Sequence, residues 1–129
     1  MEEIRISSDS RNQMIDLTSR VQQVVHESGV EEGTCLIYCP HTTAAITINE
    51  GADPAVREDI LNALDEIVPD IDFKHTESNS DAHIKSSIVG PGERVLVRGR
   101  KLKLGRWQKI FFCDFDGPRS RRVWVKVEG

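Results

Sequence analysis

The chain has 129 residues and a mass of 14.5 kDa, a length that favours one domain covering residues 1–129. Hydrophobic types make up 38% of the residues and charged types 29%, and this composition excludes a disordered or fibrous chain. The formal net charge is -4, which argues against nucleic acid as a partner of the whole chain.

Three features favour a soluble protein of the reducing cytoplasm. No apolar run approaches the roughly 18 residues that a membrane-spanning helix needs. The first residues, MEEIR, lack the basic and then apolar order of a signal peptide. The three cysteines form no Cys-x-x-Cys pair, which argues against a disulfide framework or a four-thiolate zinc site.

The charge is divided unevenly along the chain. Residues 1–70 carry 14 acidic and 4 basic side chains, whereas residues 71–129 carry 7 acidic and 13 basic ones. We expect the two parts to neutralise each other within one fold or across subunits. Nucleic-acid binding is disfavoured because aromatic residues are also sparse. A third interpretation is that some of these bases bind a small phosphorylated ligand.

The first half of the chain predicts strands and one amphipathic helix. Residues 3–7 alternate between polar and apolar types, as a half-buried strand does. Apolar residues follow helical spacing between Asp16 and Gly29, with Asp16 or Thr18 as the cap at the start. Residues 33–39 and 42–49 then read as two strands that Pro40 separates.

The second half begins with the helix that the sequence predicts most clearly. Asp53-Pro54 is a capping residue followed by proline, and the apolar residues after it share one helical face as far as Pro69. A short helix is predicted over 81–89, with Ser80 or Asp81 as its cap. Three further strands are expected at 94–98, 107–115 and 121–127.

This order of elements predicts an α+β domain. The sheets should be mostly antiparallel, and two main helices and one short helix should accompany them.

Three of the four histidines lie at predicted element ends, where functional sites are usually built. His41 follows Pro40 between two strands, and His75 and His83 flank a polar loop. Catalytic zinc commonly takes three protein ligands, and three imidazoles could supply them. The spacing matches no zinc motif, so three unrelated surface histidines remain the alternative. His26 reads as a surface residue near the end of its helix.

The loop between His75 and His83 also supplies two candidate catalytic carboxylates. Glu77 could act as a general base or as a metal ligand, and Asp81 could orient a ligating histidine. Asp81 could instead serve only as a helix cap. A nucleophilic pair of Cys39 and His41 is disfavoured, because Pro40 bends the chain between them.

Candidate phosphate-binding residues lie beside these histidines and near the last turn. Lys85 and Ser86 follow His83, and Arg119 follows the Asp-Gly-Pro turn, where its guanidinium could bind phosphate oxygens in a bidentate manner. Thr42 and Thr43 place hydroxyl groups next to His41. For the arginines just after Arg119, a basic strand edge that opposes aggregation is an equally good interpretation.

Three ordered motifs together resemble the YjbQ family over essentially the full chain. The first is HTTAAITINE at 41–50 with Asp53-Pro54 after it, and the second is SDAHIKSS at 80–87. The third is GRWQKI at 105–110 with DGPR at 116–119. Two positions depart from the usual family pattern: Asp114 stands where glutamate is common, and Arg106 where threonine is common.

The resemblance implies more than the spacing does. It implies a β-sandwich-like α+β domain that forms a homotrimer, with a metal site, often zinc, near the subunit boundary. Carried over to this sequence, the metal ligands would be His41, His75 and His83. Members are described as secondary thiamine-phosphate synthases, so the implied reaction joins a pyrimidine diphosphate to a thiazole phosphate and releases pyrophosphate.

Two other functions remain open at this point. One is metal-dependent hydrolysis of a small phosphorylated or acyl substrate, with Glu77 as the base. The other is a trimeric module in which the metal is only structural. Zinc is the expected metal, because imidazoles suit it, and magnesium is the alternative if a diphosphate substrate brings it.

Overall fold

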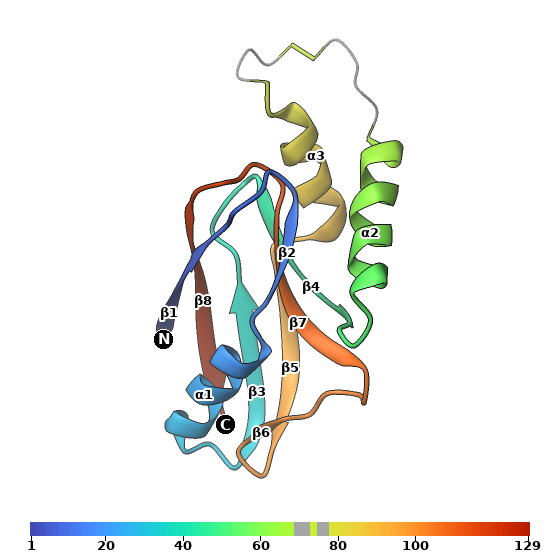
Figure 1. Cartoon of the computed structure of the whole chain (residues 1–129). Coiled ribbons are helices and arrows are strands. Elements are labelled where there is room, and N and C mark those ends of the chain that lie inside the picture. The colour runs from blue at the N-terminus through green and yellow to red at the C-terminus, as the bar shows by residue number, and fades with distance from the viewer. Residues whose placement is uncertain (69–72, 75–77) are drawn as a thin grey trace.

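The computed structural model describes residues 1–68, 73–74 and 78–129, and two antiparallel sheets form its centre (Figure 1). The five-stranded sheet has the order β1-β8-β3-β5-β6 and the three-stranded sheet the order β2-β7-β4. The strands are β1 (Glu2–Ser7), β2 (Gln13–Asp16), β3 (Glu32–Tyr38), β4 (Ala44–Glu50), β5 (Gly92–Arg98), β6 (Lys101–Leu102), β7 (Gln108–Asp114) and β8 (Ser120–Glu128).

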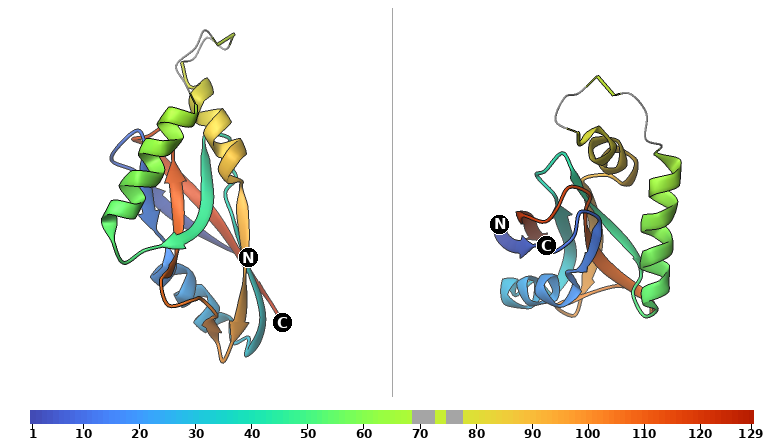
Figure 2. Two further views of the ribbon diagram at one scale, coloured as in Figure 1. Left: turned by 90° about the vertical axis from the view of Figure 1, so that its right-hand side faces the viewer. Right: turned by 45° about the horizontal axis from the view of Figure 1, so that its top comes forward.

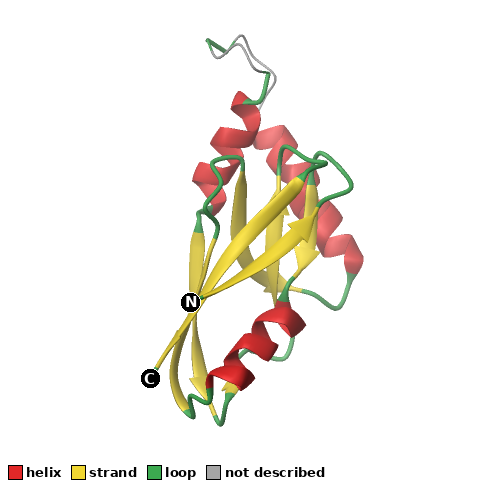
Figure 3. Ribbon diagram, turned by 90° about the vertical axis from the view of Figure 1, so that its left-hand side faces the viewer, coloured by secondary structure: helices red, strands yellow, loops and turns green. Residues whose placement is uncertain are grey.

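Three helices accompany the sheets: α1 (Thr18–Ser28), α2 (Pro54–Ile67) and α3 (Ser80–Val89). Helices α2 and α3 lie on the side of the three-stranded sheet, away from both chain termini (Figure 2). Strands β1 and β8 lie in front when the molecule is viewed from the side opposite to the left panel of Figure 2 (Figure 3). The predicted α+β class with mostly antiparallel sheets is therefore confirmed. Within the described residues, no helix is both long and apolar enough to cross a bilayer.

The ends of α1 and α2 follow from local chemistry. Leu17 occupies the N-cap position of α1, so neither Asp16 nor Thr18 is the cap that the sequence predicts. The Asp16 carboxylate accepts a hydrogen bond from the Thr18 N–H at 2.9 Å, and Gly29 ends α1 with a left-handed φ of 72°. The Asp53 carboxylate accepts from the Ala55 N–H at 3.0 Å, directly before α2. The predicted start of α2 is therefore confirmed.

Helix α3 begins differently from the prediction. Asn79 occupies the N-cap position and makes no side-chain capping hydrogen bond, so neither Ser80 nor Asp81 is the cap. Asp81 lies in the first turn, where its carboxylate pairs with the Arg11 guanidinium at 2.9 Å. A cap precedes the helix, whereas Ser80 and Asp81 are already its first two residues.

The core has two parts, one on each face of the three-stranded sheet. The larger part lies between the two sheets and includes Ile37, Ile46 and Phe112 together with the buried face of α1. The smaller part includes Phe111 and Phe115 and lies against α2 and α3. Helix α3 therefore packs against a sheet whose other face is also buried.

Two short strands and the position of β8 were not predicted. Strand β2 has only one fully buried side chain, Met14, and β6 has two residues, so neither gives a clear alternating pattern. Strand β8 lies between β1 and β3 and is no edge. The interpretation of Arg121 as an edge cation is therefore wrong, since its side chain points into the core and is buried.

Candidate functional site

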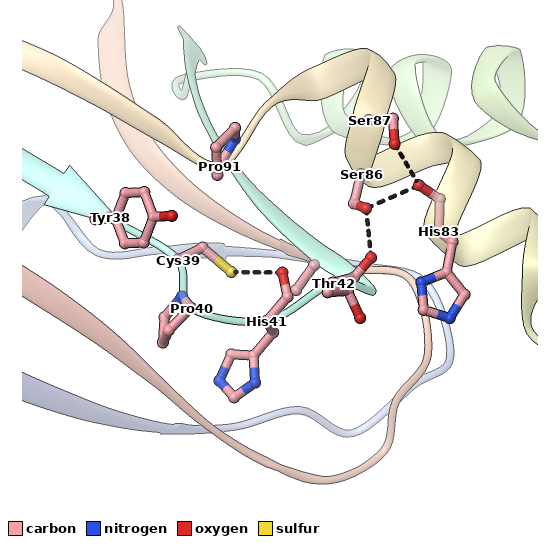
Figure 4. Close-up of a pocket in the computed structure, with 10 residues that line it drawn as sticks. Tyr38, Cys39, Pro40, His41, Thr42, His83, Ser86, Ser87 and Pro91 are labelled. Carbon is pink, nitrogen blue, oxygen red and sulfur yellow. Dashed lines mark hydrogen bonds between the residues drawn. The ribbon is translucent and has the colours of Figure 1, made fainter.

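A pocket of about 470 Å³ lies where the connection from β3 to β4 meets α3 (Figure 4). Two of the three predicted metal ligands, His41 and His83, line it although 42 positions separate them in the chain. The full lining is Tyr38, Cys39, Pro40, His41, Thr42, Ala44, His83, Ser86, Ser87 and Pro91. The structure thus brings together four of the predicted site residues, His41, Thr42, His83 and Ser86.

Hydrogen bonds join the two walls of this pocket. The Cys39 N–H donates to the Pro91 carbonyl oxygen at 2.7 Å. The Ser86 hydroxyl lies 2.5 Å from the Thr42 carbonyl oxygen and 2.9 Å from that of His83, and it can donate to one of them at a time. Ser86 thus ties α3 to the loop that carries His41, and its oxygen remains an acceptor.

His41 is held in the neutral state that metal binding and base chemistry require. The backbone N–H of Arg122 donates to its Nε2 at 3.0 Å, and the edge of the ring meets Phe112. Burial lowers the pKa of His41 below its ordinary value of 6.5, and the positive charges of Arg121 and Arg122 lower it further. A neutral imidazole is the form that binds a metal.

Thr43, a predicted substrate-binding residue, is buried behind the pocket and takes part in another network. Its Oγ1 accepts a hydrogen bond from Nη2 of Arg121 at 2.8 Å. The same guanidinium donates to both oxygens of Asp114, at 2.7 and 3.1 Å, and the Ser8 hydroxyl donates to Asp114 at 2.7 Å. Thr43 therefore belongs to the support of the site, together with this ion pair.

The pKa of Asp114 shows which effect wins in this network. Burial alone would raise it, but hydrogen bonds from Arg121, Ser8 and the Asp116 N–H outweigh burial and hold the pKa below its ordinary value of 3.8. Asp114 is therefore ionised and satisfied inside the core. The aspartate that departs from the usual family pattern has a structural partner in Arg121.

The two predicted phosphate-binding cations lie outside this pocket. Lys85 is only 2% exposed and contacts Asp65 and Asn12 on the side of α3 away from His83. The Arg119 guanidinium is half exposed and pairs with Asp116 at 3.0 Å. Asp81, a predicted catalytic residue, is bound to Arg11.

His75 and Glu77 lie outside the described residues, so the three-histidine cluster stays a prediction. Among residues 1–68, 73–74 and 78–129, no group of three His, Cys, Asp or Glu side chains is placed to hold a metal ion. Two of the three predicted ligands, His41 and His83, line the pocket, and the third lies outside the described residues.

Sequence reasoning missed the apolar part of the lining and the buried ion pair. Tyr38 and Pro91 line the pocket, yet nothing in their local pattern marks them as site residues. Cys39 also lines the pocket, and the sequence indicates it only by its place two positions before His41. Arg121 and Asp114 are seven positions apart on β8 and β7, which belong to different sheets, and only the packing of the two sheets shows that their side chains meet.

The comparisons with known proteins agree over the whole chain. The family model described as "UPF0047 protein YjbQ-like" matches residues 2–129. The UPF0047 protein YugU of Bacillus subtilis is 48% identical, covering 98% of this chain and 97% of that protein. The UPF0047 protein MJ1081 of Methanocaldococcus jannaschii is also 48% identical, covering 97% of this chain and 91% of that protein.

Solved structures of similar chains have the same fold. An uncharacterised YjbQ/UPF0047 protein from Clostridium acetobutylicum has a TM-score of 0.97 and 49% identity, over 99% of this chain and 100% of that one. A YbjQ-like protein from Sulfolobus solfataricus has a TM-score of 0.94 and 36% identity, over 98% of this chain and 94% of that one. The chain therefore belongs to the YjbQ/UPF0047 family.

Proposed function

We propose that the protein is a metal-binding enzyme of the thiamine-phosphate synthase type, with this reaction as a main or a secondary activity. The observation that carries the proposal is the pocket of about 470 Å³ that His41 and His83 share with three serine and threonine residues. Imidazoles suit a transition metal, and hydroxyl groups suit phosphate oxygens. Thr42, Ser86 and Ser87 are these serine and threonine residues.

Zinc is the metal that we propose for this site, because imidazoles suit it. His41 and His83 would be two ligands, and His75 is the third expected one. The Arg122 N–H now donates to Nε2 of His41, so a metal at that nitrogen would replace this hydrogen bond. A divalent cation would supply positive charge for a diphosphate leaving group. Magnesium carried by the diphosphate is the alternative.

The proposed reaction asks little acid–base chemistry of the chain. The lone pair of the thiazole nitrogen forms the new C–N bond, the C–O bond to the diphosphate breaks, and pyrophosphate leaves with that electron pair. The chain's own task is to position two substrates and exclude water. Tyr38, Pro40 and Pro91 offer apolar surface for a ring beside the hydroxyl groups.

One observation favours the alternative of a metal-dependent hydrolase. The lining of the pocket, as far as the structure describes it, contains no Lys or Arg side chain. The negative charge of a diphosphate needs positive charge beside it, and the described lining offers only imidazoles and hydroxyl groups. A small monophosphate or acyl substrate carries less negative charge and needs less compensation. Glu77 is the candidate base of that reaction.

An activity assay separates these proposals. Protein purified without a His-tag is mixed with zinc or magnesium, hydroxymethylpyrimidine diphosphate and thiazole phosphate, and thiamine phosphate and pyrophosphate are measured. We expect both products in equal amounts, and a loss of at least roughly 100-fold in the His83→Ala variant. Release of phosphate from a simple phosphate ester without thiamine phosphate would indicate the hydrolase. No turnover in either assay would indicate a binding module.

We further propose that the protein is a homotrimer, as expected from the family resemblance. The outer face of the five-stranded sheet supports association, because apolar side chains gather there. Leu96 is 65% exposed and Tyr38 is 40% exposed, and Tyr38 stacks on Trp124 with ring centroids 6.1 Å apart. An apolar patch of this kind commonly marks an interface. Tyr38 also lines the pocket, so a subunit docked here would adjoin the site.

Replacing Leu96 with lysine should break this assembly. In sedimentation experiments we expect the unchanged protein at three times the 14.5 kDa of one chain, and Leu96→Lys as smaller species. Ile88→Lys is the matched control, because Ile88 is similarly exposed but lies on α3. A single 14.5 kDa species of the unchanged protein at micromolar concentration would contradict the trimer.

A further inference from the structure

The buried ammonium of Lys85 joins four separate segments of the fold. Its Nζ donates to the Asp65 carboxylate on α2 and, at 3.3 Å, to the Asn12 side-chain oxygen in the β1–β2 connection. It lies 5.9 Å from the centre of the Phe115 ring after β7, and 4.0 Å from the Asp81 carboxylate one turn earlier on α3. With Lys85 only 2% exposed, this is a tightly enclosed charge.

Helix α3 has two faces with different surroundings. At 100° per residue, Asp81, Ala82, Lys85 and Val89 share the face that packs on the sheet, where Ala82 is fully buried. His83, Ser86 and Ser87 share the next face and line the pocket. Because one rigid helix carries both faces, whatever fixes the Lys85 face also fixes the positions of the pocket residues.

The surroundings of Lys85 argue against a direct role in binding phosphate. Its charge is balanced by Asp65, which is half exposed, and by the more distant Asp81, which Arg11 also pairs with at 2.9 Å. Moving the ammonium into the pocket would break these contacts and leave Asp65 without its partner.

We propose that Lys85 is a positioning residue for the candidate site. It locks α3 onto α2, onto the β1–β2 connection and onto Phe115. The lock holds His83 at the pocket and Ser86 within hydrogen-bond distance of the Thr42 carbonyl oxygen. This inference rests on the proposed function only in taking the pocket as the site; the anchoring of α3 is measured without any activity.

Amide hydrogen exchange tests the anchoring directly. In Lys85→Met we expect the protection of α3 amides, such as Gly90, to fall at least about tenfold, whereas the amides of β7 keep theirs. Asp65→Asn should produce the same local loss of protection, and this variant should still fold, because the Asp65 side chain is half exposed. Lys85→Arg, which keeps the cation, should restore most of the protection. Lys126→Met removes an exposed lysine and is the matched control.

Binding of inorganic pyrophosphate completes the experiment. The positioning role predicts that pyrophosphate affinity and α3 protection fall together in Lys85→Met and recover together in Lys85→Arg. Two results would overturn it. In one, β7 loses protection as much as α3 does, so that Lys85 serves only global stability. In the other, α3 protection is unchanged while pyrophosphate affinity falls, so that Lys85 contacts phosphate directly. Failure of the proposed synthase reaction alone would leave the exchange pattern intact.

Discussion

Replacing Asp114 with asparagine is expected to lower the free energy of unfolding by roughly 3–5 kcal/mol, because it leaves a buried guanidinium without its counter-ion. Asp114 is 0% exposed and receives hydrogen bonds from Nε and Nη2 of Arg121, the Ser8 hydroxyl and the Asp116 N–H. An amide could accept some of these bonds, yet it would bring no negative charge. Urea denaturation followed by circular dichroism measures the loss.

Two comparisons make this result specific to the buried pair. Glu128→Gln removes the acid of an exposed pair with Lys126 and should change stability by less than about 1 kcal/mol. The folded-state pKa of Asp114 lies below 3.8, so the pair stabilises fully above that pH and loses its effect as pH falls through the folded pKa. The difference between Asp114→Asn and the unchanged protein should therefore shrink in acid. A constant difference would contradict the assignment.

The loss of bound zinc is the largest functional effect that we expect. Protein purified without a His-tag should carry close to one zinc per chain, and the combined replacement of His41, His75 and His83 by alanine should remove it. Zinc binding should weaken as pH falls through the histidine range near 6.5, because protonated imidazole cannot bind metal. His41 should stay neutral to a lower pH than an ordinary histidine, because burial and the charges of two arginines lower its pKa.

Elemental analysis of the dialysed protein measures this prediction. His26→Ala is the control, because His26 lies on α1 and is absent from the pocket lining. Full zinc content in the triple variant would refute the assignment of the three histidines. Zinc that is lost equally from the control variant would show that the metal binds elsewhere.

The sequence predicted the elements whose signals are local. Helix α2 starts with a capping aspartate and a proline and has one apolar face, and all of that information lies within 15 residues. Strand β2 was not predicted, because it depends on pairing with β7 almost 100 positions later. The same limit applies to the cap of α3, where a contact with Arg11 decides what Asp81 does.

For the site, residue types in the sequence indicate the candidate residues but not the direction in which their side chains point. His41 and His83 both stand at element ends and line one pocket, whereas the metal site that they would form with His75 stays a prediction. Lys85 and Thr43 have the right chemistry for phosphate, but both are buried by partners from distant segments. A short polar motif shows that a helix or strand carries useful groups, and only the packing decides which of them reach the pocket.

Strand β7 has a consequence for how sequences with this fold can diverge. Its residues from Ile110 to Asp114 are all buried, because one face meets the five-stranded sheet and the other meets α2 and α3. A polar substitution at any of these five positions would place a polar group in the core, whereas β1 has exposed residues that alternate with buried ones and tolerate change. We therefore expect relatives to differ mostly at the exposed positions of β1, β5 and β8, and least along β7.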